Sequence, residues 1–256
     1  MKTVGVIPAR FGSTRFPGKP LHKIYNQTLI EWVIDSAKKS KLLDEVIVAT
    51  DHKDIFEKAK SKNVMAVMTD SALPTGSDRV WQAVQNINCE LVVNIQGDEP
   101  LLDPQQIDRV VELLNESPQC EMSTLVSSLK SKDDFNSINI VKVILNKNNE
   151  AIYFSRFGIP LSRGNFDLES ANSNESDVPF RHIGMYGYRK FFLEKFCNTP
   201  PCWLEQMESL EQLRALWLGA KIKVGIGNYE SIGVDTLEDA IKVERWLVER
   251  KKSNPS

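Results

Sequence analysis

Short apolar runs alternate with amphipathic segments along the first half of the chain. Runs rich in β-branched residues predict strands, and the mixed segments between them predict helices that cover a sheet. The predicted strands are Val4–Ile7, Glu45–Ala49, Val64–Met68 and Leu91–Gln96, and the predicted helices are Leu29–Ser40, Asp54–Lys60, Asp78–Ile87 and Pro104–Glu116. This alternation predicts an α/β protein with a mainly parallel, Rossmann-like sheet. Because the strands are apolar almost throughout, helices should cover both faces, which makes a three-layer sandwich.

The pattern changes after about residue 120. Strand-like runs follow one another there with little room for helices, which predicts a smaller antiparallel extension. These runs are Met122–Leu129, Ile140–Asn146, Ala151–Ser155 and His182–Tyr188, and two helices, Leu204–Leu218 and Thr236–Glu249, are expected to close the chain. The polar segment 162–179 has no periodicity, so we expect a surface loop or a lid. We therefore expect one domain over 1–256, with the extension at about 120–200.

Composition limits the kinds of function. The chain has 256 residues, 41% of them hydrophobic, which is enough for the core of an enzyme domain. Its 32 Lys and Arg residues against 34 Asp and Glu give a net charge of -2, so no overall basic field indicates nucleic-acid binding. No apolar run approaches the roughly 18 residues of a membrane span, and we expect a cytoplasmic protein without membrane contact. The four cysteines are spaced poorly for zinc, and we expect reduced thiols.

The first predicted strand runs directly into a loop that carries three cations. Arg10, Arg15 and Lys19 are spaced around Gly12 and Gly18. Ligands of open α/β sheets bind beyond the carboxyl ends of strands, so this loop is expected to hold a small polyphosphate. It is not a Walker loop, because five residues rather than four separate the glycines and a proline follows the lysine. A basic surface turn is the alternative interpretation.

Two aspartates are candidate ligands for a divalent cation. Asp98 follows the fourth predicted strand, and Asp235 precedes the last predicted helix. A bound triphosphate requires magnesium, which one or two carboxylates typically hold together with phosphates and waters. In the alternative interpretation, Asp98 caps a tight turn and Asp235 caps a helix. The glycine turn before the third predicted helix offers Ser77 and Arg79 to a base or a phosphate, or is an ordinary helix start.

Several motifs occur in series, and together they are more specific than any one of them. They are PARFGSTRFPGKPL at 8–21, VATD at 48–51, TGSDR at 75–79, VNIQGDEP at 93–100, YFSR at 153–156, RHIGMYGYR at 181–189, LEQLR at 210–214 and GVDT at 233–236. In order and spacing they resemble the 3-deoxy-manno-octulosonate (Kdo) cytidylyltransferases, the CMP-Kdo synthetase family of Gram-negative bacteria.

The resemblance implies a homodimeric, magnesium-dependent enzyme with the nucleotide-diphospho-sugar transferase type of fold. Such an enzyme joins CTP to Kdo and releases pyrophosphate, in lipopolysaccharide biosynthesis. By position, the residues expected at the nucleotide are Arg10, Ser13, Arg15, Lys19, Arg79 and Gln96. Lys19, Arg10 and Asp98 are expected to act in catalysis, and Asp98 and Asp235 to hold Mg²⁺. The residues expected at the sugar are Arg156, His182, Tyr186, Glu211 and Gln212, and the extension at 120–200 is expected to form the dimer contact.

Several alternatives stay open at this point. His182 and Tyr186 are also compatible with packed strand positions, and Glu211 and Gln212 with a solvated helix face. The substrate is Kdo, its 8-amino analogue or another sugar acid. Outside enzymes, the alternative is a nucleotide-binding regulatory protein without turnover. The paired aspartates argue against that alternative, because nucleotide binding alone hardly needs two carboxylates around one metal.

Overall fold

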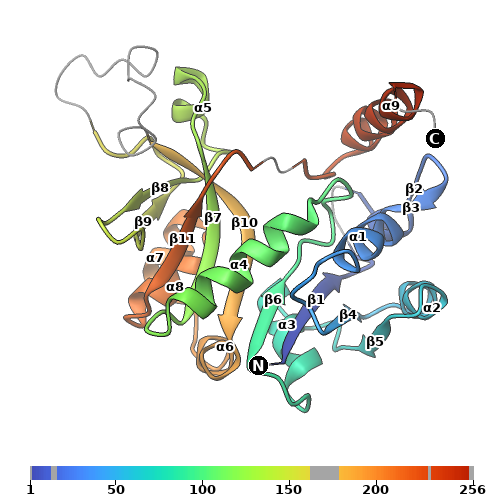
Figure 1. Cartoon of the computed structure of the whole chain (residues 1–256), viewed down its shortest axis with the longest axis horizontal. Coiled ribbons are helices and arrows are strands. Elements are labelled where there is room, and N and C mark those ends of the chain that lie inside the picture. Colours follow the sequence, from blue (N-terminus) through green and yellow to red (C-terminus); the bar gives the residue numbers. More distant parts are fainter. Residues whose placement is uncertain (1, 13–15, 162–178, 230–231, 254–256) are drawn as a thin grey trace. The chain divides into compact units, whose positions relative to one another are not determined.

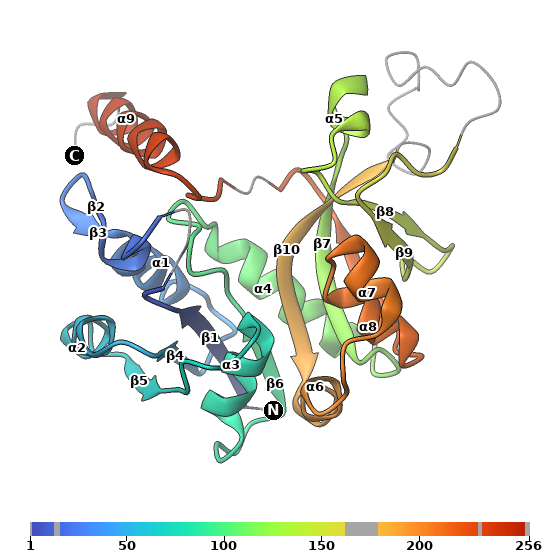
Figure 2. The ribbon, with the colours of Figure 1, turned by 180° about the vertical axis from the view of Figure 1, so that it is seen from behind.

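The chain forms two compact units in a computed structural model that describes residues 2–12, 16–161, 179–229 and 232–253 (Figures 1 and 2). Unit 1 consists of residues 1–108 and 231–256, and unit 2 of residues 109–230. The antiparallel extension expected at about 120–200 lies within unit 2. The expected lid at 162–179 lies outside the described residues, except for Pro179.

Unit 1 is built on a parallel sheet with the strand order β6-β1-β4-β5. The strands are β1 (Thr3–Ala9), β4 (Glu45–Thr50), β5 (Met65–Met68) and β6 (Leu91–Asn94). All residues of β6 and nearly all of β1 are buried. The predicted parallel sheet, with its central strands covered on both faces, is therefore confirmed.

Helices α1 (Leu29–Ala37), α2 (Lys53–Ser61) and α3 (Gly76–Val84) connect these strands. The chain steps outward from β1 through β4 to β5, and then returns through α3 to β6 on the other side of β1. Right-handed crossovers put the returning helix on the opposite face from α1 and α2, as the two opposite views show (Figures 1 and 2). The strand order thus reverses beside β1, which is where open α/β sheets bind their ligands.

Local signals explain where the helices of unit 1 begin. Thr28 and Glu31 form a capping box at the start of α1, in which the Thr28 N–H donates to Glu31 Oε2 over 2.8 Å. Thr75 caps α3 by accepting from the Asp78 N–H over 3.1 Å. The sequence analysis did not predict the short elements before α1, which are η1 (Lys19–Leu21), β2 (Lys23–Ile24) and β3 (Gln27–Thr28). The last helix, α9 (Leu237–Ser253), also belongs to unit 1.

Unit 2 contains a mixed sheet with the strand order β11-β7-β10-β8-β9. Its strands are β7 (Met122–Ser128), β8 (Lys142–Leu145), β9 (Ala151–Ser155), β10 (Phe180–Arg189) and β11 (Ile222–Ile226). All pairs are antiparallel except β11 with β7, and β11 was not predicted. The helices in this part of the chain are α4 (Pro104–Glu116), α5 (Lys132–Asn136), α6 (Lys190–Cys197), α7 (Trp203–Glu208) and α8 (Gln212–Trp217).

The single helix predicted over Leu204–Leu218 is wrong, because α7 and α8 are separate. Ser209 adopts a left-handed conformation with φ 51°, which ends α7. The preceding carboxylate, that of Glu208, accepts hydrogen bonds from the Ser155 hydroxyl over 2.8 Å and from the Arg156 N–H over 2.9 Å. The break is therefore held by contacts with β9, a segment about fifty residues earlier in the chain.

None of the described helices combines the length and the hydrophobicity needed to cross a bilayer. All four cysteines lie in the described part of the chain as free thiols, and Cys89, Cys120 and Cys202 are buried.

Candidate active site

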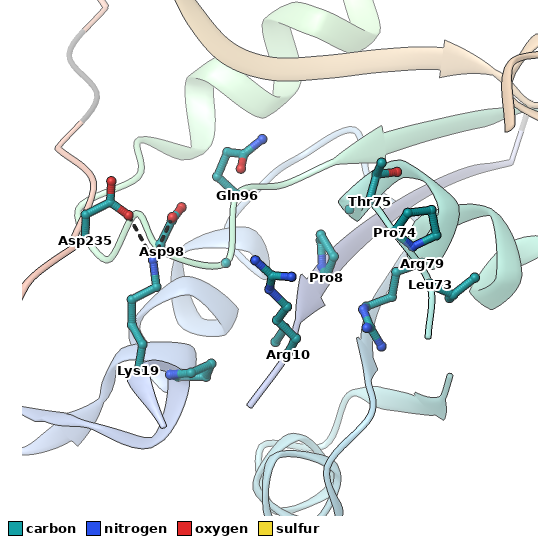
Figure 3. A pocket seen from close by; sticks show the side chains of 14 residues that line it. Pro8, Arg10, Lys19, Leu73, Pro74, Thr75, Arg79, Gln96, Asp98 and Asp235 are labelled. Atoms are coloured by element: carbon teal, nitrogen blue, oxygen red, sulfur yellow. Dashed lines mark hydrogen bonds and ion pairs between the residues drawn. The ribbon is translucent and has the colours of Figure 1, made fainter. Parts of the chain in front are cut away.

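A cavity of about 330 Å³ opens in unit 1 beyond the carboxyl ends of β1 and β6 (Figure 3). Its wall includes the residues predicted for the nucleotide and the metal that the structure describes: Arg10, Lys19, Arg79, Gln96, Asp98 and Asp235. The predicted residues Ser13 and Arg15 lie outside the described residues. The structure therefore brings together segments from both ends of unit 1 at the point where its strand order reverses.

Two glycines shape the cavity. A Cβ on Gly97 would lie 2.6 Å from the carbonyl oxygen of Pro8, so only glycine lets the turn after β6 approach the end of β1. Gly18 has φ +70°, and its N–H donates to the Phe11 carbonyl over 3.1 Å. This bond closes the loop that begins after Arg10, and Lys19 follows it directly as the first residue of η1.

The ammonium of Lys19 lies between two carboxylates in this cavity (Figure 3). Its Nζ is 2.9 Å from Oδ2 of Asp98 and 3.3 Å from Oδ1 of Asp235. Within the described part of the chain, Lys19 is the hydrogen-bond partner of the Asp98 carboxylate, rather than a backbone N–H of the turn that carries Asp98. The turn-capping interpretation of Asp98 is therefore wrong. Two carboxylate oxygens converge on one cation.

The start of α9 leaves the Asp235 carboxylate facing the cavity. The Val234 N–H donates to the carbonyl of Asp98 over 2.9 Å, which ties this segment to the turn after β6. Thr236 is the helix cap, because its hydroxyl accepts from the Asp239 N–H over 3.2 Å while the Asp239 carboxylate accepts from the Thr236 N–H over 3.0 Å. The alternative interpretation of Asp235 as the cap is therefore wrong.

Exchanging Asp235 and its neighbour separately tests this division of roles. We expect Asp235→Asn to reduce turnover strongly and to change thermal stability little, because the capping hydrogen bonds are unaffected. We expect Thr236→Ala to destabilise the protein by about 1 kcal/mol, because a helix cap is lost, and to leave turnover near the parent value. Steady-state kinetics and thermal unfolding of both variants measure the two effects. The reverse pattern would make Asp235 a structural residue.

Arg79 lines the cavity, but its guanidinium is buried. Only 4% of the side chain is exposed, and it donates to Thr69 Oγ1 and, over 3.1 Å, to Oδ2 of Asp51. Ser77, in the same turn of α3, is buried as well. Sequence reasoning gave no role to Asp51, the partner of Arg79, although it follows β4 directly, and a carboxylate after a strand was the signal that selected Asp98.

Three of the residues predicted for the sugar come together in unit 2, namely His182, Tyr186 and Glu211. His182 and Tyr186 lie on β10 with their ring centroids 5.2 Å apart. Burial, followed by Tyr188 and Glu211, raises the pKa of Tyr186 well above its ordinary value, so its hydroxyl stays protonated. Gln212 begins α8 directly after Glu211 and is buried. The solvated-face interpretation is therefore wrong for Gln212.

The hydrogen bonds of Thr124 fix the tautomer of His182. The Thr124 hydroxyl is 2.8 Å from Nε2 of His182 and also contacts the carbonyl oxygens of Ile183 and Met185. The carbonyls can only accept, so the single hydroxyl proton goes to one of them, and Nε2 must donate to Thr124. The lone pair of Nδ1 then makes His182 a hydrogen-bond acceptor at that atom.

His182 makes the stability of the protein depend on pH. Burial lowers the pKa of His182 from 6.5 to about 3, so the folded chain cannot take up the proton that the unfolded chain binds. Above the unfolded pKa of about 6.5 the ring is neutral in both the folded and the unfolded chain, so His182 takes nothing from the stability there. As pH falls from about 6.5 towards 3, stability is lost by at most about 1.4 kcal/mol per pH unit. Urea unfolding of the parent and of His182→Gln between about pH 7 and pH 5 should show a shallower pH dependence in the variant. Equal slopes would contradict a His182 that stays neutral in the folded chain.

Arg156 has a different environment from the other residues predicted for the sugar. Its guanidinium donates to three backbone carbonyls, to Glu208 over 2.9 Å, to Ile138 over 3.1 Å and to Ser209 over 3.3 Å. These bonds hold the turn between α7 and α8. The pairing of Arg156 with a substrate carboxylate stays a prediction.

An open parallel sheet with cations and paired carboxylates at its switch point defines a nucleotide-binding α/β enzyme of the nucleotidyltransferase class. The family model described as "Cytidylyltransferase" matches residues 4–222. The chain belongs to this family, and within it to the 3-deoxy-manno-octulosonate cytidylyltransferases.

Two relatives and one solved structure illustrate the similarity. The 3-deoxy-manno-octulosonate cytidylyltransferase of Bdellovibrio bacteriovorus is 51% identical over 96% of this chain and 98% of its own length. That of Thermodesulfovibrio yellowstonii is 44% identical over 96% of this chain and 98% of its own length. A solved structure of CMP:2-keto-3-deoxy-manno-octonic acid synthetase complexed with CTP has a TM-score of 0.89 at 31% identity, over 98% of this chain and all of that one.

Proposed function

We propose that this chain transfers the cytidylyl group of CTP to Kdo, giving CMP-Kdo and pyrophosphate for lipopolysaccharide synthesis. Membership of the cytidylyltransferase family supports the nucleotide, and the names of its relatives support the sugar acid. The observation that carries the proposal is the cavity in which Lys19 meets Asp98 and Asp235 beside Arg10. Cations and carboxylates in one wall fit a magnesium triphosphate better than they fit an uncharged ligand.

Magnesium fits the residues of this cavity. Asp98 and Asp235 direct carboxylate oxygens at a single cation, the Lys19 ammonium, and oxygen is the donor that Mg²⁺ prefers. No group of three or more metal-ligating side chains occurs among the described residues, which suits an ion that takes its other ligands from phosphates and water. We propose that Asp98 and Asp235 hold it. When bound, it supplies positive charge to the phosphate oxygens.

The chain's own residues then have distinct tasks. In the proposed reaction the anomeric hydroxyl of Kdo bonds to the α-phosphorus and its proton passes to solvent water, and the bond between the α-phosphorus and the β-phosphate oxygen breaks with its electron pair on pyrophosphate. Arg10 and Lys19 stabilise negative charge on the transferring and leaving oxygens. Gln96 and the wall formed by Arg79 position the cytidine part. In unit 2, Nδ1 of His182 accepts a hydrogen bond from a sugar hydroxyl.

Pyrophosphate release tests the proposal. We expect it only when CTP, magnesium and a Kdo-type sugar acid are all present. Measuring pyrophosphate release with each of three sugar acids in turn, Kdo, 8-amino-Kdo and a sialic-type acid, identifies the substrate among them. Turnover with a hexose 1-phosphate but not with Kdo would reject the proposal. Binding of CTP without turnover of any sugar acid would point to a regulatory nucleotide-binding protein.

Arg156→Ala tests the sugar side of the proposal. We expect a higher KM for Kdo, because a lost charge-assisted contact costs roughly 1.5–3 kcal/mol, and a lower melting temperature, because three carbonyls lose their donor. Calorimetric CTP binding should stay unchanged. Weaker CTP binding with an unchanged KM for Kdo would move Arg156 to the nucleotide side. A lower melting temperature without any change in KM would limit Arg156 to the turn it holds.

We propose further that the enzyme works in the cytoplasm as a homodimer formed through unit 2. Large apolar side chains are exposed on this unit, among them Ile152, Phe157, Leu161, Trp203 and Met207. Exposed apolar side chains of this size are typical of surfaces that a partner covers. Light scattering on the parent and on Met207→Glu tests this, and a parent that is monomeric at working concentrations would reject it.

A further inference from the structure

Asp51 directly follows β4 and, among the described residues, has a separate partner for each carboxylate oxygen. Oδ1 accepts from the backbone N–H of Phe11 over 3.1 Å, and Oδ2 accepts from Nη2 of Arg79 over 3.1 Å. Only 12% of the Asp51 side chain is exposed. Asp51 does not line the cavity itself, so within the described part of the chain it can affect a ligand there through these two contacts.

The contact with Phe11 holds the start of the loop between β1 and η1, called here the cation loop because Arg10 and Lys19 flank it. Phe11 follows Arg10 directly, and its carbonyl accepts from Gly18, the residue before Lys19. The Phe11 ring stacks on the ring of His52, with centroids 4.0 Å apart and an interplanar angle of 12°. Consecutive residues, Asp51 and His52, therefore fix the backbone and the side chain of one loop residue, between the two cations that line the cavity.

The contact with Arg79 fixes part of the cavity wall. The second arm of the guanidinium donates to Thr69, after β5, so Arg79 joins the carboxyl ends of β4 and β5. A buried guanidinium is costly unless an opposite charge pairs with it. In the described structure that charge is Asp51. One carboxylate thus connects the cation loop to the wall that carries Arg79.

We propose that Asp51 is a positioning residue for the triphosphate: it sets the backbone at Phe11 so that Arg10 and Lys19 face the cavity before the nucleotide binds. The inference rests on the proposed function and adds a residue to it. When Arg10 and Lys19 already face the cavity, binding of CTP does not have to supply the free energy of ordering them. The loss of Asp51 should therefore weaken CTP affinity. Once CTP is bound, its phosphates themselves hold Arg10 and Lys19 in place, and the chemical step should change less.

Asp51→Asn is the first variant, because it keeps the size of the side chain. Its amide has one oxygen and one NH₂ group, so it cannot accept from both Phe11 and Arg79. We expect CTP to bind about tenfold more weakly in calorimetry with magnesium and without sugar. We expect the KM for CTP to rise by a similar factor while kcat stays within about threefold. A purely structural defect would instead lower kcat through a smaller active fraction and leave KM unchanged, and that result would overturn the proposal.

A double variant separates the loop contact from the ion pair. In Arg79→Gln the contact between Asp51 and the Phe11 N–H persists, so adding Asp51→Ala, which leaves that N–H without its acceptor, should weaken CTP binding again, by about tenfold. Equal affinities of Arg79→Gln and the double variant would show that Asp51 acts only through Arg79, which would overturn the proposal. Asp70→Asn is the matched control: Asp70 follows β5, is exposed, accepts from the Ala72 N–H, and should bind CTP like the parent.

His52→Asn answers the question if Asp51→Asn does not fold. Asparagine can still cap α2, as His52 does through the Asp54 N–H, but it lacks the ring that stacks on Phe11. About threefold weaker CTP binding with an unchanged melting temperature would support a loop that is held at Phe11 by the residues after β4. Unchanged CTP binding would overturn the proposal. A parent protein that binds no CTP would reject the proposed function instead, which keeps the two failures distinct.

Discussion

Asp98→Asn is expected to lower kcat by about 10³-fold, because a bound metal contributes several kcal/mol to transition-state stabilisation and each 1.36 kcal/mol is a factor of ten. The substitution keeps the size of the side chain and removes its charge. In the structure this carboxylate lies 2.9 Å from the Lys19 ammonium, and its turn is held by backbone hydrogen bonds instead. The fold should therefore persist. Steady-state kinetics over a magnesium titration and thermal unfolding measure both quantities.

Asp103→Asn is the matched control for this experiment. Asp103 lies five residues further along the chain, accepts from the Gln105 N–H over 2.9 Å at the start of α4, and is absent from the cavity wall. It should change stability little, because asparagine caps a helix about as well as aspartate, and it should leave kcat near the parent value. Near-normal turnover of Asp98→Asn at ordinary magnesium concentrations would remove Asp98 from the metal site.

Lys19→Met is expected to lower kcat by roughly 10²–10³-fold, the usual effect of removing one preorganised donor from a site where negative charge develops. Methionine keeps the apolar stem of the side chain and removes the ammonium. CTP affinity should fall much less, because this charge is needed most in the transition state. Lys23→Met is the control, since Lys23 is exposed on β2 and does not line the cavity. A large loss of CTP affinity with unchanged kcat would give Lys19 a binding role only.

The same variant has a consequence for stability that does not depend on turnover. Without the ammonium, Asp98 and Asp235 face each other with no cation between them, and like charges at short range repel. We expect Lys19→Met to melt at a lower temperature than the parent without magnesium, and to gain more from added magnesium. An identical magnesium response in parent and variant would contradict competition between the Lys19 ammonium and a divalent cation for the two carboxylates.

Much of unit 1 could be predicted because its signals are local. An apolar run buried on both faces is typical of a central parallel strand, and β1, β4 and β6 lie where such runs occur, whereas β5 at the sheet edge is only partly buried. A loop after such a strand lies at the ligand-binding end of the sheet whatever the rest of the chain does. Arg10, Lys19 and Asp98 were therefore found from position alone, and all of them line the cavity.

Tertiary structure decided the features that depend on distant partners. The break between α7 and α8 cannot be seen in the sequence, because the left-handed Ser209 is held by Arg156 and Glu208 through contacts with β9. Strand β11 was missed for the same reason, since its partner β7 lies about a hundred residues earlier. Hydrogen bonds of this kind are specified by two segments together, and neither segment carries the pattern alone.

The sequence by itself determined the parallel sheet, the ligand-binding end of unit 1, and the types of charged residue that line the cavity there. Only the tertiary structure decided the role of each carboxylate. Asp98 and Asp235 could both have been caps from their local sequence, and Asp51 had no assigned role at all. Each was resolved by a partner far away in the chain: Lys19 for the first two, and Phe11 with Arg79 for the third. The physical reason is that a carboxylate acts through the groups that folding brings to it, whereas a strand depends mainly on the hydrophobicity of its own residues.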